Sequence, residues 1–334
     1  MPVLYLTEQG ATLKKEGDCF LITKDGQVFQ EVPAMKVEQI IVLGNVNLTT
    51  PVIHYLLKEG IECVFCSSYG KYHGRLFSNE SKFGALRQRQ FQKTVDPLAK
   101  LAAAREIVRG KLLNQRTFLM RYFRKTQDPQ LDSTVESFKQ CLKQVDEIKD
   151  IGALLGLEGY TSTLYFQSLR ALLGQKLGFV SRARRPPPDP VNSLLSFGYT
   201  LLTYDMQTAV QTVGLDPFLG FLHATEYSRP SLALDLIEEF RTIVTDSVVL
   251  RLINTQVITK EDFEPPQGPK KGVFLTQEGI KKFLHHYEER VQTLVFHPTD
   301  RVRVTYRRCF NLQSRHIARY IMGQEIRYQP FLVK

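Results

Sequence analysis

Cysteine is scarce in this chain of 334 residues, and the five cysteines are widely scattered. Their small number excludes the dense disulfide framework of small secreted domains. Cys63 and Cys66 form a single Cys-x-x-Cys pair, but the apolar segment around them is typical of a β-strand. A structural zinc ion needs four ligands, and no second pair lies at a suitable spacing. We therefore interpret the cysteines as structural.

The sequence also lacks an apolar run near the ~18 residues that a membrane-spanning helix needs. Its first residues, Met-Pro-Val-Leu-Tyr-Leu-Thr-Glu, have neither the basic start nor the long apolar core of a signal peptide. Gly/Ser-rich linkers and low-complexity segments are absent as well. We expect a globular protein of the cytoplasm, with room for one large or two ordinary domains.

Positive charge is concentrated in two segments of the chain, whose formal net charge is +10. Residues 81–125 hold 12 Lys or Arg against two acidic residues, and residues 301–334 hold eight against one. The remaining chain is therefore net acidic. Rows of Lys and Arg bind polyanions because they release phosphate counterions. A solvated basic face could explain either segment alone, but the two together indicate a nucleic-acid partner.

The hydrophobic periodicity divides the chain in two. Short apolar runs alternate with turn residues at first, and Asp25-Gly26 is a strong hairpin signal. Near residue 82 the period changes to that of helices and stays so almost to the end, with a last helix over about 303–321. We predict an α+β fold, in which a small β-rich, sandwich-like domain over residues 1–82 precedes a larger all-α domain over residues 83–334.

The segment from Gly220 to Arg241 contains a histidine and several acidic side chains that could bind a metal ion. His223 precedes Pro230, which suits the first position of a helix running to about residue 252. At about 100° per residue, one face of this helix collects acidic side chains: Asp235, Glu238, Glu239 and Asp246. Such a row is either a solvated face or, with the imidazole of His223, a site for Mg²⁺ or Mn²⁺. Composition alone does not choose between them.

A second acidic candidate is Glu158, which lies between Gly156 and Gly159 near the start of a predicted helix. Small neighbours let a phosphate backbone or another chain approach closely. Glu158 heads a largely apolar stripe that includes Tyr165. Burial of such a glutamate costs free energy unless the side chain is paired or metal-bound. An ordinary glutamate at a helix terminus is the alternative.

Arginines supply the candidate DNA contacts. Arg182, Arg184 and Arg185 stand beside four prolines, which make the segment extended and stiff. Guanidinium groups fixed in this way suit phosphate contacts, although ordinary loop composition is the alternative. Arg105 and Arg109 lie on a predicted basic helix over residues 98–123. We include these five arginines and Tyr165 as predicted DNA-binding residues.

Three motifs in combination resemble one family. They are Gly156-Leu-Glu-Gly159, Arg184-Arg-Pro-Pro-Pro-Asp-Pro-Val-Asn192, and Gly220-Phe-Leu-His223 with the segment from Pro230 to Phe240. Over essentially its whole length the chain resembles the CRISPR-associated integrase-endonuclease, the first protein of that system's numbered series. The resemblance implies a catalytic Mg²⁺ or Mn²⁺ site made of Glu158, His223 and Glu238. The nearby acidic position of the family falls on Asp235.

The resemblance also implies a reaction and partners. The family binds double-stranded and single-stranded DNA and inserts captured fragments into a CRISPR array, joining their 3′ hydroxyls to array phosphodiesters. It works as homodimers, usually through the N-terminal domains, and a small ferredoxin-like partner, the second CRISPR-associated protein, bridges two dimers. Transesterification needs a metal to lower the pKa of the attacking hydroxyl and to neutralise charge on phosphorus. Endonuclease activity is the same chemistry with water as nucleophile. The alternative is a non-catalytic DNA-binding scaffold of the same fold.

Overall fold

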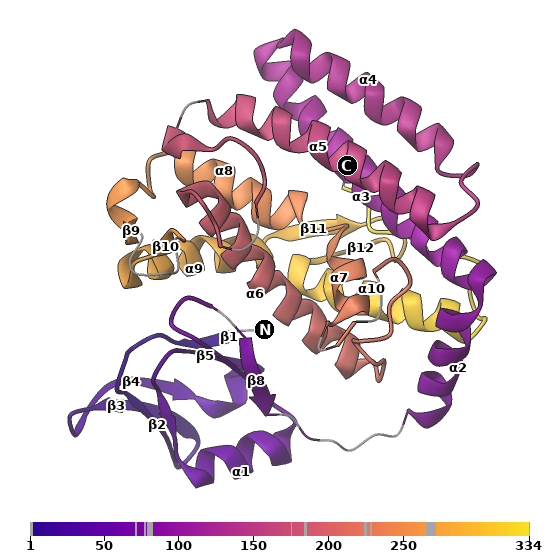
Figure 1. Cartoon of the computed structure of the whole chain (residues 1–334). Coiled ribbons are helices and arrows are strands. Elements are labelled where there is room, and N and C mark those ends of the chain that lie inside the picture. Colours follow the sequence, from indigo (N-terminus) through magenta and orange to yellow (C-terminus); the bar gives the residue numbers. More distant parts are fainter. Residues whose placement is uncertain are drawn as a thin grey trace. The chain divides into compact units, whose positions relative to one another are not determined.

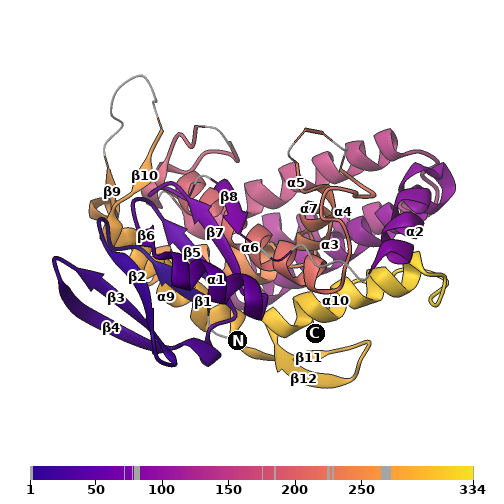
Figure 2. The same ribbon diagram turned by 90° about the horizontal axis from the view of Figure 1, so that it is seen from below.

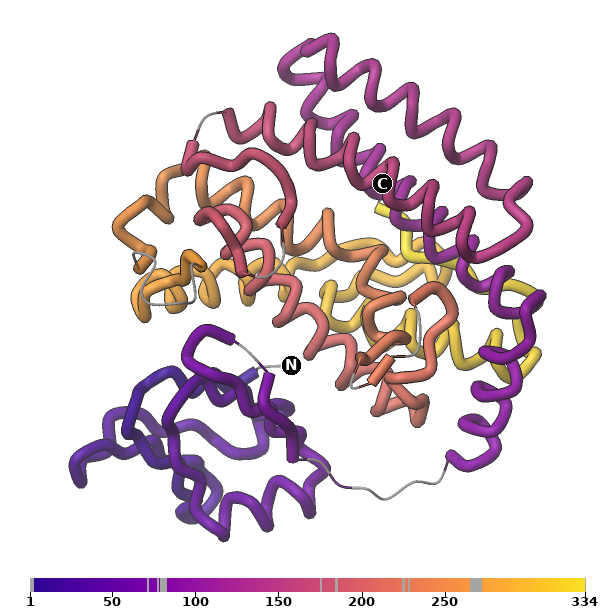
Figure 3. Tube along the Cα trace, in the orientation of Figure 1, coloured from indigo at the N-terminus to yellow at the C-terminus, as the bar shows by residue number. Residues whose placement is uncertain are grey.

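A computed structural model describes residues 3–70, 72–76, 78, 83–174, 176–183, 186–223, 226, 227, 229–264 and 272–333. The chain divides into two compact units, Met1–Ser81 and Lys82–Lys334. The first unit is rich in strands and the second is mainly helical (Figure 1, Figure 3). The predicted α+β class is therefore confirmed. None of the helices in the described ranges has both the length and the apolar character needed to cross a membrane.

The first unit contains two four-stranded sheets, with strand orders β1-β5-β7-β8 and β4-β3-β2-β6. In the first sheet β1, β5 and β7 are parallel, and β8 is antiparallel to β7. Asp25 and Gly26 have φ angles of 51° and 81° and form the turn between β3 and β4, as the Asp-Gly pair predicts. The strands are β1 (Val3–Leu6), β2 (Thr12–Glu16), β3 (Cys19–Lys24), β4 (Gln27–Pro33), β5 (Gln39–Leu43), β6 (Asn47–Leu48), β7 (Glu62–Cys66) and β8 (Tyr72–Leu76).

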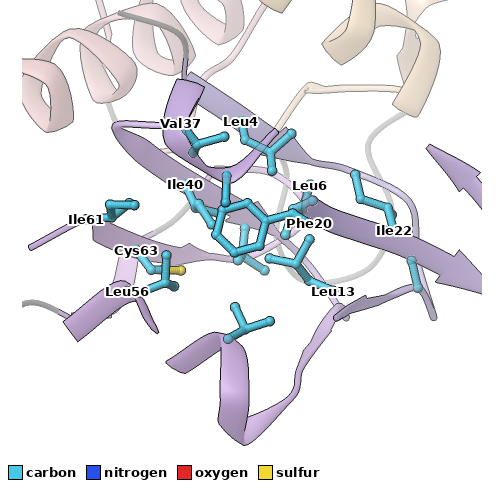
Figure 4. Packing of buried hydrophobic residues seen from close by; sticks show 14 residues of the cluster. Leu4, Leu6, Leu13, Phe20, Ile22, Val37, Ile40, Leu56, Ile61 and Cys63 are labelled. Carbon is cyan, nitrogen blue, oxygen red and sulfur yellow. The ribbon is translucent and has the colours of Figure 1, made fainter. Parts of the chain in front are cut away.

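Both sheets and one helix, α1 (Thr50–Glu59), contribute to a single apolar core (Figure 4). Leu13 and Phe20 come from one sheet, Cys63 from the other and Leu56 from α1, and all four are fully buried. Burial raises the pKa of the Cys63 thiol to about 12, so the thiol stays protonated. This agrees with the structural role predicted for the cysteine pair.

Helices build most of the second unit, and their starts follow the sequence. Asp96 accepts a hydrogen bond from the backbone N–H of Leu98, and Pro97 occupies the first turn of the longest helix. Asp150 caps another helix through the N–H of Ala153. The helices are α2 (Gly84–Val95), α3 (Pro97–Thr126), α4 (Pro129–Gln144), α5 (Ile151–Leu173), α6 (Pro190–Thr212), α7 (Ser231–Ile237), α8 (Ser247–Asn254), α9 (Gln277–Val291) and α10 (Tyr306–Ile321). Helices α3, α4 and α5 lie side by side (Figure 1, Figure 2).

The second unit is not wholly helical, in contrast to the prediction. Strands β9 (Phe263–Glu264) and β10 (Phe274–Leu275) pair, as do β11 (Leu294–His297) and β12 (Val302–Thr305). The predicted start of the last helix near residue 303 is therefore wrong by about one turn. The Val302-Arg-Val-Thr305 segment has β-branched residues at alternate positions, which favour a strand. Figure 2 shows the β11–β12 hairpin beside α10.

The helix predicted from Pro230 to about residue 252 is interrupted. Pro230 is the residue before α7 rather than its first residue, and α7 ends at Ile237. A turn follows, and Thr242–Asp246 form a π-helix that leads into α8. A π-turn contains an extra residue, so side chains before and after it do not share the faces of one regular helix. The predicted acidic row is therefore divided among several directions.

Candidate active site

The acidic side chains of α7, of the turn after it and of the π-helix are buried, which excludes the solvated-face interpretation. Asp235 and Glu239 are fully buried, and Glu238 is 2% exposed. Asp246 accepts hydrogen bonds from the hydroxyls of Tyr165 and Tyr199, at 2.7 and 2.6 Å. Glu239 bonds to the C-terminal segment, whereas Asp235 and Glu238 point toward His223. Helix α7, which carries Asp235, packs against α3 and α6 (Figure 1).

Asp235 fixes the position of His223. Its carboxylate accepts the backbone N–H groups of Phe221, Leu222 and His223 at 2.6 to 3.0 Å. Its Oδ1 also lies 2.7 Å from Nδ1 of the His223 ring. An ionised carboxylate only accepts hydrogen bonds, so Nδ1 carries the proton and Nε2 keeps its lone pair. A carboxylate behind a histidine in this way is the usual support of a metal-binding imidazole.

Glu158 and Glu238 meet at the ammonium group of Lys111. Nζ of Lys111 contacts Oε1 of Glu158 and lies 2.8 Å from Oε2 of Glu238. Ser162, one turn after Glu158 on α5, donates to the same Oε1 at 2.9 Å. Nε2 of His223 is 3.9 Å from Oε1 of Glu238. The structure thus brings Glu158, His223 and Glu238 together from α5, the loop before α7 and the turn after it.

Positive charge keeps Glu238 ionised. Burial opposes its charged form, but Arg241 and Lys111, with His223 when its ring is protonated, outweigh that effect and lower the pKa of Glu238 to about 2. Nη1 of Arg241 lies 3.1 Å from Oε1 of Glu238, and its guanidinium lies 4.9 Å from the centre of the Tyr199 ring. Glu238 therefore carries a full negative charge at any pH near neutrality.

The donor set fits a hard divalent cation. Two carboxylates and a neutral imidazole suit Mg²⁺ or Mn²⁺, whose remaining ligands are water or phosphate oxygens. In the structure a cation, the Lys111 ammonium, already stands between the two carboxylates. Oε2 of Glu238 has the Lys111 ammonium 2.8 Å away, so a metal ion bound there would take the place of this ammonium. Glu158 is the more exposed of the two, at 22%, so a substrate can approach from its side.

Lys111 was not recognised as a site residue from the sequence, where it counted among the basic residues of α3. The position of Lys111 on the apolar face of the helix could have indicated its role. Lys111 follows Ala104, Ile107 and Val108 at helical spacing, and all three are fully buried. A lysine on the apolar face of a helix must reach a buried anion or lose its charge. Here the lysine side chain is 6% exposed and reaches two glutamates.

Three of the arginines predicted to contact DNA have hydrogen-bond or ion-pair partners within the chain. Arg109 pairs with Glu106 and Asp146, and Arg105 donates to the carbonyl oxygen of Ile148. Arg182 donates to Asn192 at 2.9 Å. These three arginines therefore have partners within the chain, which a phosphate would have to replace or share.

The remaining predicted DNA-binding residues are Tyr165, Arg184 and Arg185. Tyr165 is fully buried and donates to Asp246, which argues against the predicted DNA contact and makes it a packing residue. Arg184 and Arg185 lie outside the described residues.

A family model and a relative of known name both match this chain over most of its length. The family model described as CRISPR associated protein Cas1 matches residues 4–289. A relative from Thermus thermophilus, CRISPR-associated endonuclease Cas1 3, is 37% identical and covers 99% of this chain and 97% of its own length.

Solved structures share the fold over the whole chain. A Cas1 protein from Thermotoga maritima is 26% identical, covers 100% of both chains and has a TM-score of 0.83. A chain of a Cas6-RT-Cas1–Cas2 complex is 24% identical, with a TM-score of 0.83, and it covers 99% of this chain and 36% of that one.

Proposed function

Because the chain belongs to the Cas1 family, the endonucleases and integrases of CRISPR adaptation, we propose that it inserts captured DNA fragments into a CRISPR array in a metal-dependent reaction. The bond-forming step joins a 3′ hydroxyl to an array phosphodiester, and hydrolysis by the same site gives endonuclease activity. The observation that carries the proposal is the convergence of Glu158 and Glu238 on one ammonium group, with Nε2 of His223 3.9 Å from Glu238.

Glu158, His223 and Glu238 would hold Mg²⁺ or Mn²⁺. When bound, the ion lowers the pKa of the attacking hydroxyl and neutralises charge on the phosphate. The chain's own contribution is preorganisation. Asp235 holds His223 with its Nε2 lone pair toward Glu238, and Arg241 helps to keep Glu238 ionised. Asp235 has four groups donating to it already, so its role is to position His223 rather than to bind the ion.

Lys111 and Arg241 add fixed positive charge at the same place. Both groups are largely buried beside Glu238, at 6% and 15% side-chain exposure. With a divalent ion on the two carboxylates, the Lys111 ammonium would need another anion as its partner. We propose that a phosphate of the DNA strand is this partner. Positive charge beside the phosphate would stabilise the negative charge that develops on its oxygens.

The proposal includes partners. Family membership supports DNA as the substrate, and a chain of the same fold occurs in a complex with Cas2. We propose homodimers formed through the first unit, bridged by a Cas2-like protein. The exposed glycines beside Glu158, Gly156 and Gly159, leave room for a DNA backbone near the site.

The test is a strand-transfer assay with Mn²⁺ or Mg²⁺, a fragment with free 3′ hydroxyls and supercoiled array DNA, with and without the small partner protein. Wild type would be compared with Glu158→Gln, His223→Ala and Glu238→Gln. Each variant should lose transfer by more than about 100-fold, the scale expected when one group that stabilises transition-state charge is removed. DNA affinity should remain.

Glu136→Gln is the matched control, because Glu136 is an exposed glutamate of α4 at 55% side-chain exposure. It should transfer strands like wild type. Transfer by the three site variants at the wild-type rate, or loss of DNA binding together with activity, would contradict the catalytic assignment. DNA binding without transfer by any form of the protein would favour the non-catalytic scaffold.

A further inference from the structure

A second group of possible ligands lies on the β11–β12 hairpin and α10, away from Glu158 and Glu238 in the sequence. His297 ends β11, Asp300 lies in the turn of the hairpin and His316 faces them from α10. Nδ1 of His297 and Nε2 of His316 lie 3.0 and 2.9 Å from Oδ2 of Asp300. The two imidazole rings stack with an interplanar angle of 4°. One nitrogen of each ring and one carboxylate oxygen thus face a common point.

The hydrogen bonds of His297 leave a lone pair at that point. Its Nε2 lies 3.1 Å from Oε1 of Gln313. The orientation of this amide is fixed, because Nε2 of Gln313, which has two hydrogens to donate, lies within hydrogen-bond distance of three oxygens, those of Glu239, the Tyr328 hydroxyl and the Gln329 carbonyl. An amide oxygen only accepts, so Nε2 of His297 carries a proton, and in the neutral ring Nδ1 keeps its lone pair.

In that neutral form Nδ1 of His297 and Oδ2 of Asp300 meet at 3.0 Å as two electron-pair donors. The backbone N–H of Asp300 reaches Nδ1 only at 3.3 Å. His297 is fully buried, so water cannot separate the two groups on that side. A shared cation removes the repulsion between such lone pairs, whereas two hydrogen-bond acceptors alone do not attract each other.

His316 has the support that metal-binding histidines usually have. Its Nδ1 lies 3.0 Å from Oε1 of Glu325, and its Nε2 faces Asp300. A carboxylate acceptor at one ring nitrogen leaves the other free to bind a metal. Nη2 of Arg319 lies 2.7 Å from the same Nδ1 and can only donate, so a neutral ring that accepts there carries its proton on Nε2, which an ion would replace.

We propose that His297, Asp300 and His316 form a second divalent-cation site, suited to Zn²⁺, which holds the β11–β12 hairpin against α10. Two imidazoles and one carboxylate suit Zn²⁺, whereas Mg²⁺ prefers oxygen ligands throughout. Donors bound to one tetrahedral ion at about 2.0 Å lie roughly 3.3 Å apart, close to the two distances here. The Asp300 side chain is 27% exposed, so a water molecule can complete the ligand set.

Such an ion would stabilise the surroundings of the active site without taking part in the reaction. Its ligand His297 bonds to Gln313, and Gln313 donates to Glu239 at 3.0 Å. Glu239 is the residue next to Glu238 and also accepts the backbone N–H of Phe331 at 2.7 Å. The site would therefore be structural. It does not depend on the proposed catalytic function, since none of its ligands belongs to that site.

The experiment is a titration of the full chain with Zn²⁺ after chelator treatment, followed by calorimetry and by the midpoint of thermal unfolding. A background variant, Glu158→Gln with Glu238→Gln, removes the carboxylates of the active site. We expect one Zn²⁺ per chain in this background and a rise in the unfolding temperature. Adding Asp300→Asn should lower the Zn²⁺ affinity by about 10-fold or more, because it replaces an anionic ligand by a neutral one.

His316→Gln is a second variant of the same site, and Glu136→Gln is the matched control for the loss of an exposed carboxylate. Both Asp300→Asn and His316→Gln should lose most of the thermal shift, and Glu136→Gln should keep it. Asp300 is partly exposed, so its conservative change should leave the protein folded. The absence of Zn²⁺ binding in the background variant, or unchanged binding in Asp300→Asn, would overturn the proposal. Either result would leave the strand-transfer test unaffected.

Discussion

Nζ of Lys111 lies 2.8 Å from Oε2 of Glu238, and so a fixed positive charge occupies the place proposed for the metal ion. The same nitrogen contacts Glu158, whose chain position is 47 residues away. A lysine in this position prevents two buried carboxylates from repelling each other before metal and DNA arrive. It also competes with the metal for the same oxygens.

Replacing Lys111 by methionine should destabilise the metal-free protein and strengthen Mn²⁺ binding. The variant leaves Glu238 buried with one cationic partner fewer, which costs about 3 kcal/mol of unfolding free energy. Mn²⁺ then binds without displacing an ammonium group, so the rise in unfolding temperature on adding Mn²⁺ should exceed that of wild type. Differential scanning calorimetry with and without Mn²⁺ measures both effects. Lys125→Met, an exposed lysine at the end of α3, is the control. An equal or smaller Mn²⁺ effect in Lys111→Met would show that the ammonium does not occupy the metal position.

Glycines near the site should respond to alanine in opposite ways. A Cβ atom at Gly156 or Gly159 meets no atom within 4 Å, whereas at Gly220 it would lie 2.7 Å from the backbone of Ser231 and 2.8 Å from Oδ2 of Asp235. Gly156→Ala and Gly159→Ala should raise stability by about 0.5–1 kcal/mol, since both positions are inside a helix. Gly220→Ala should lower it by about 1–3 kcal/mol through overpacking. Urea denaturation measures these changes.

The same α5 variants test the approach of DNA. If a phosphate backbone passes beside Glu158, Gly156→Ala and Gly159→Ala should weaken DNA binding and slow strand transfer although they fold well. Wild-type affinity and rate in both variants would place the DNA elsewhere.

Glu239 should make the stability of the protein depend on pH. Burial raises its pKa to about 8, although hydrogen bonds from Tyr328, Phe331 and Gln313 act in the opposite direction. Between its ordinary pKa of 4.5 and about 8, the folded protein keeps a proton that the unfolded chain loses. Stability therefore falls as pH rises through this window, by up to about 1.4 kcal/mol per pH unit from this group. Above about 8 the loss is complete and constant.

Glu239→Gln isolates this effect. Asp246, whose pKa burial raises to about 6, contributes a similar slope, but it does so in both proteins. The difference in unfolding free energy between the glutamine variant and wild type should therefore move in favour of the variant as pH rises from 5 to 8. Urea denaturation at a series of pH values gives the two profiles. Parallel profiles would mean that Glu239 is ionised in the folded state.

Arginines of α10 should separate into a structural and a DNA-binding class. Arg307 is buried and pairs with Asp205 at 3.2 Å and Glu288 at 2.5 Å. Arg307→Gln should cost about 3–5 kcal/mol of stability, because it leaves Asp205 buried without its cation. Arg308 and Arg315 are exposed, so their glutamine variants should fold normally and each reduce the salt dependence of DNA affinity by about one phosphate contact.

Fluorescence anisotropy of labelled duplex DNA over a range of KCl concentrations measures the salt dependence. An unchanged slope in the double variant of Arg308 and Arg315 would exclude this face of α10 from the DNA path.

Features set by neighbouring residues could be predicted from the sequence. The Asp25-Gly26 turn and the start of α3 at Asp96-Pro97 follow from backbone preferences that act within a few residues. The period of the apolar residues predicted a change from strands to helices near residue 82, and the two compact units divide at Ser81 and Lys82. The motifs also named Glu158, His223 and Glu238, which the structure brings together, although their catalytic role remains a prediction.

Features that depend on distant contacts could not be predicted in this way. Lys111 looked like one basic residue among many, and its role became visible only when α3 and α5 were packed together. Tyr165 seemed available to DNA, but its partner Asp246 lies 81 residues further along the chain. The β11–β12 hairpin replaced the expected helix start because pairing with Leu294–His297 satisfied its backbone.

The π-helix at Thr242–Asp246 makes the chain length of this segment as important as its residue types. An α-helix advances by about 100° per residue, so a single extra residue offsets everything that follows by that angle. Glu238 faces its partners before the π-helix, and Asp246 reaches Tyr165 and Tyr199 at its end. If one residue were deleted here, Glu238 and Asp246 could not both reach their partners, because the helix after the deletion would be rotated. In a deletion scan, losing a residue from this segment should therefore be more harmful than exchanging one.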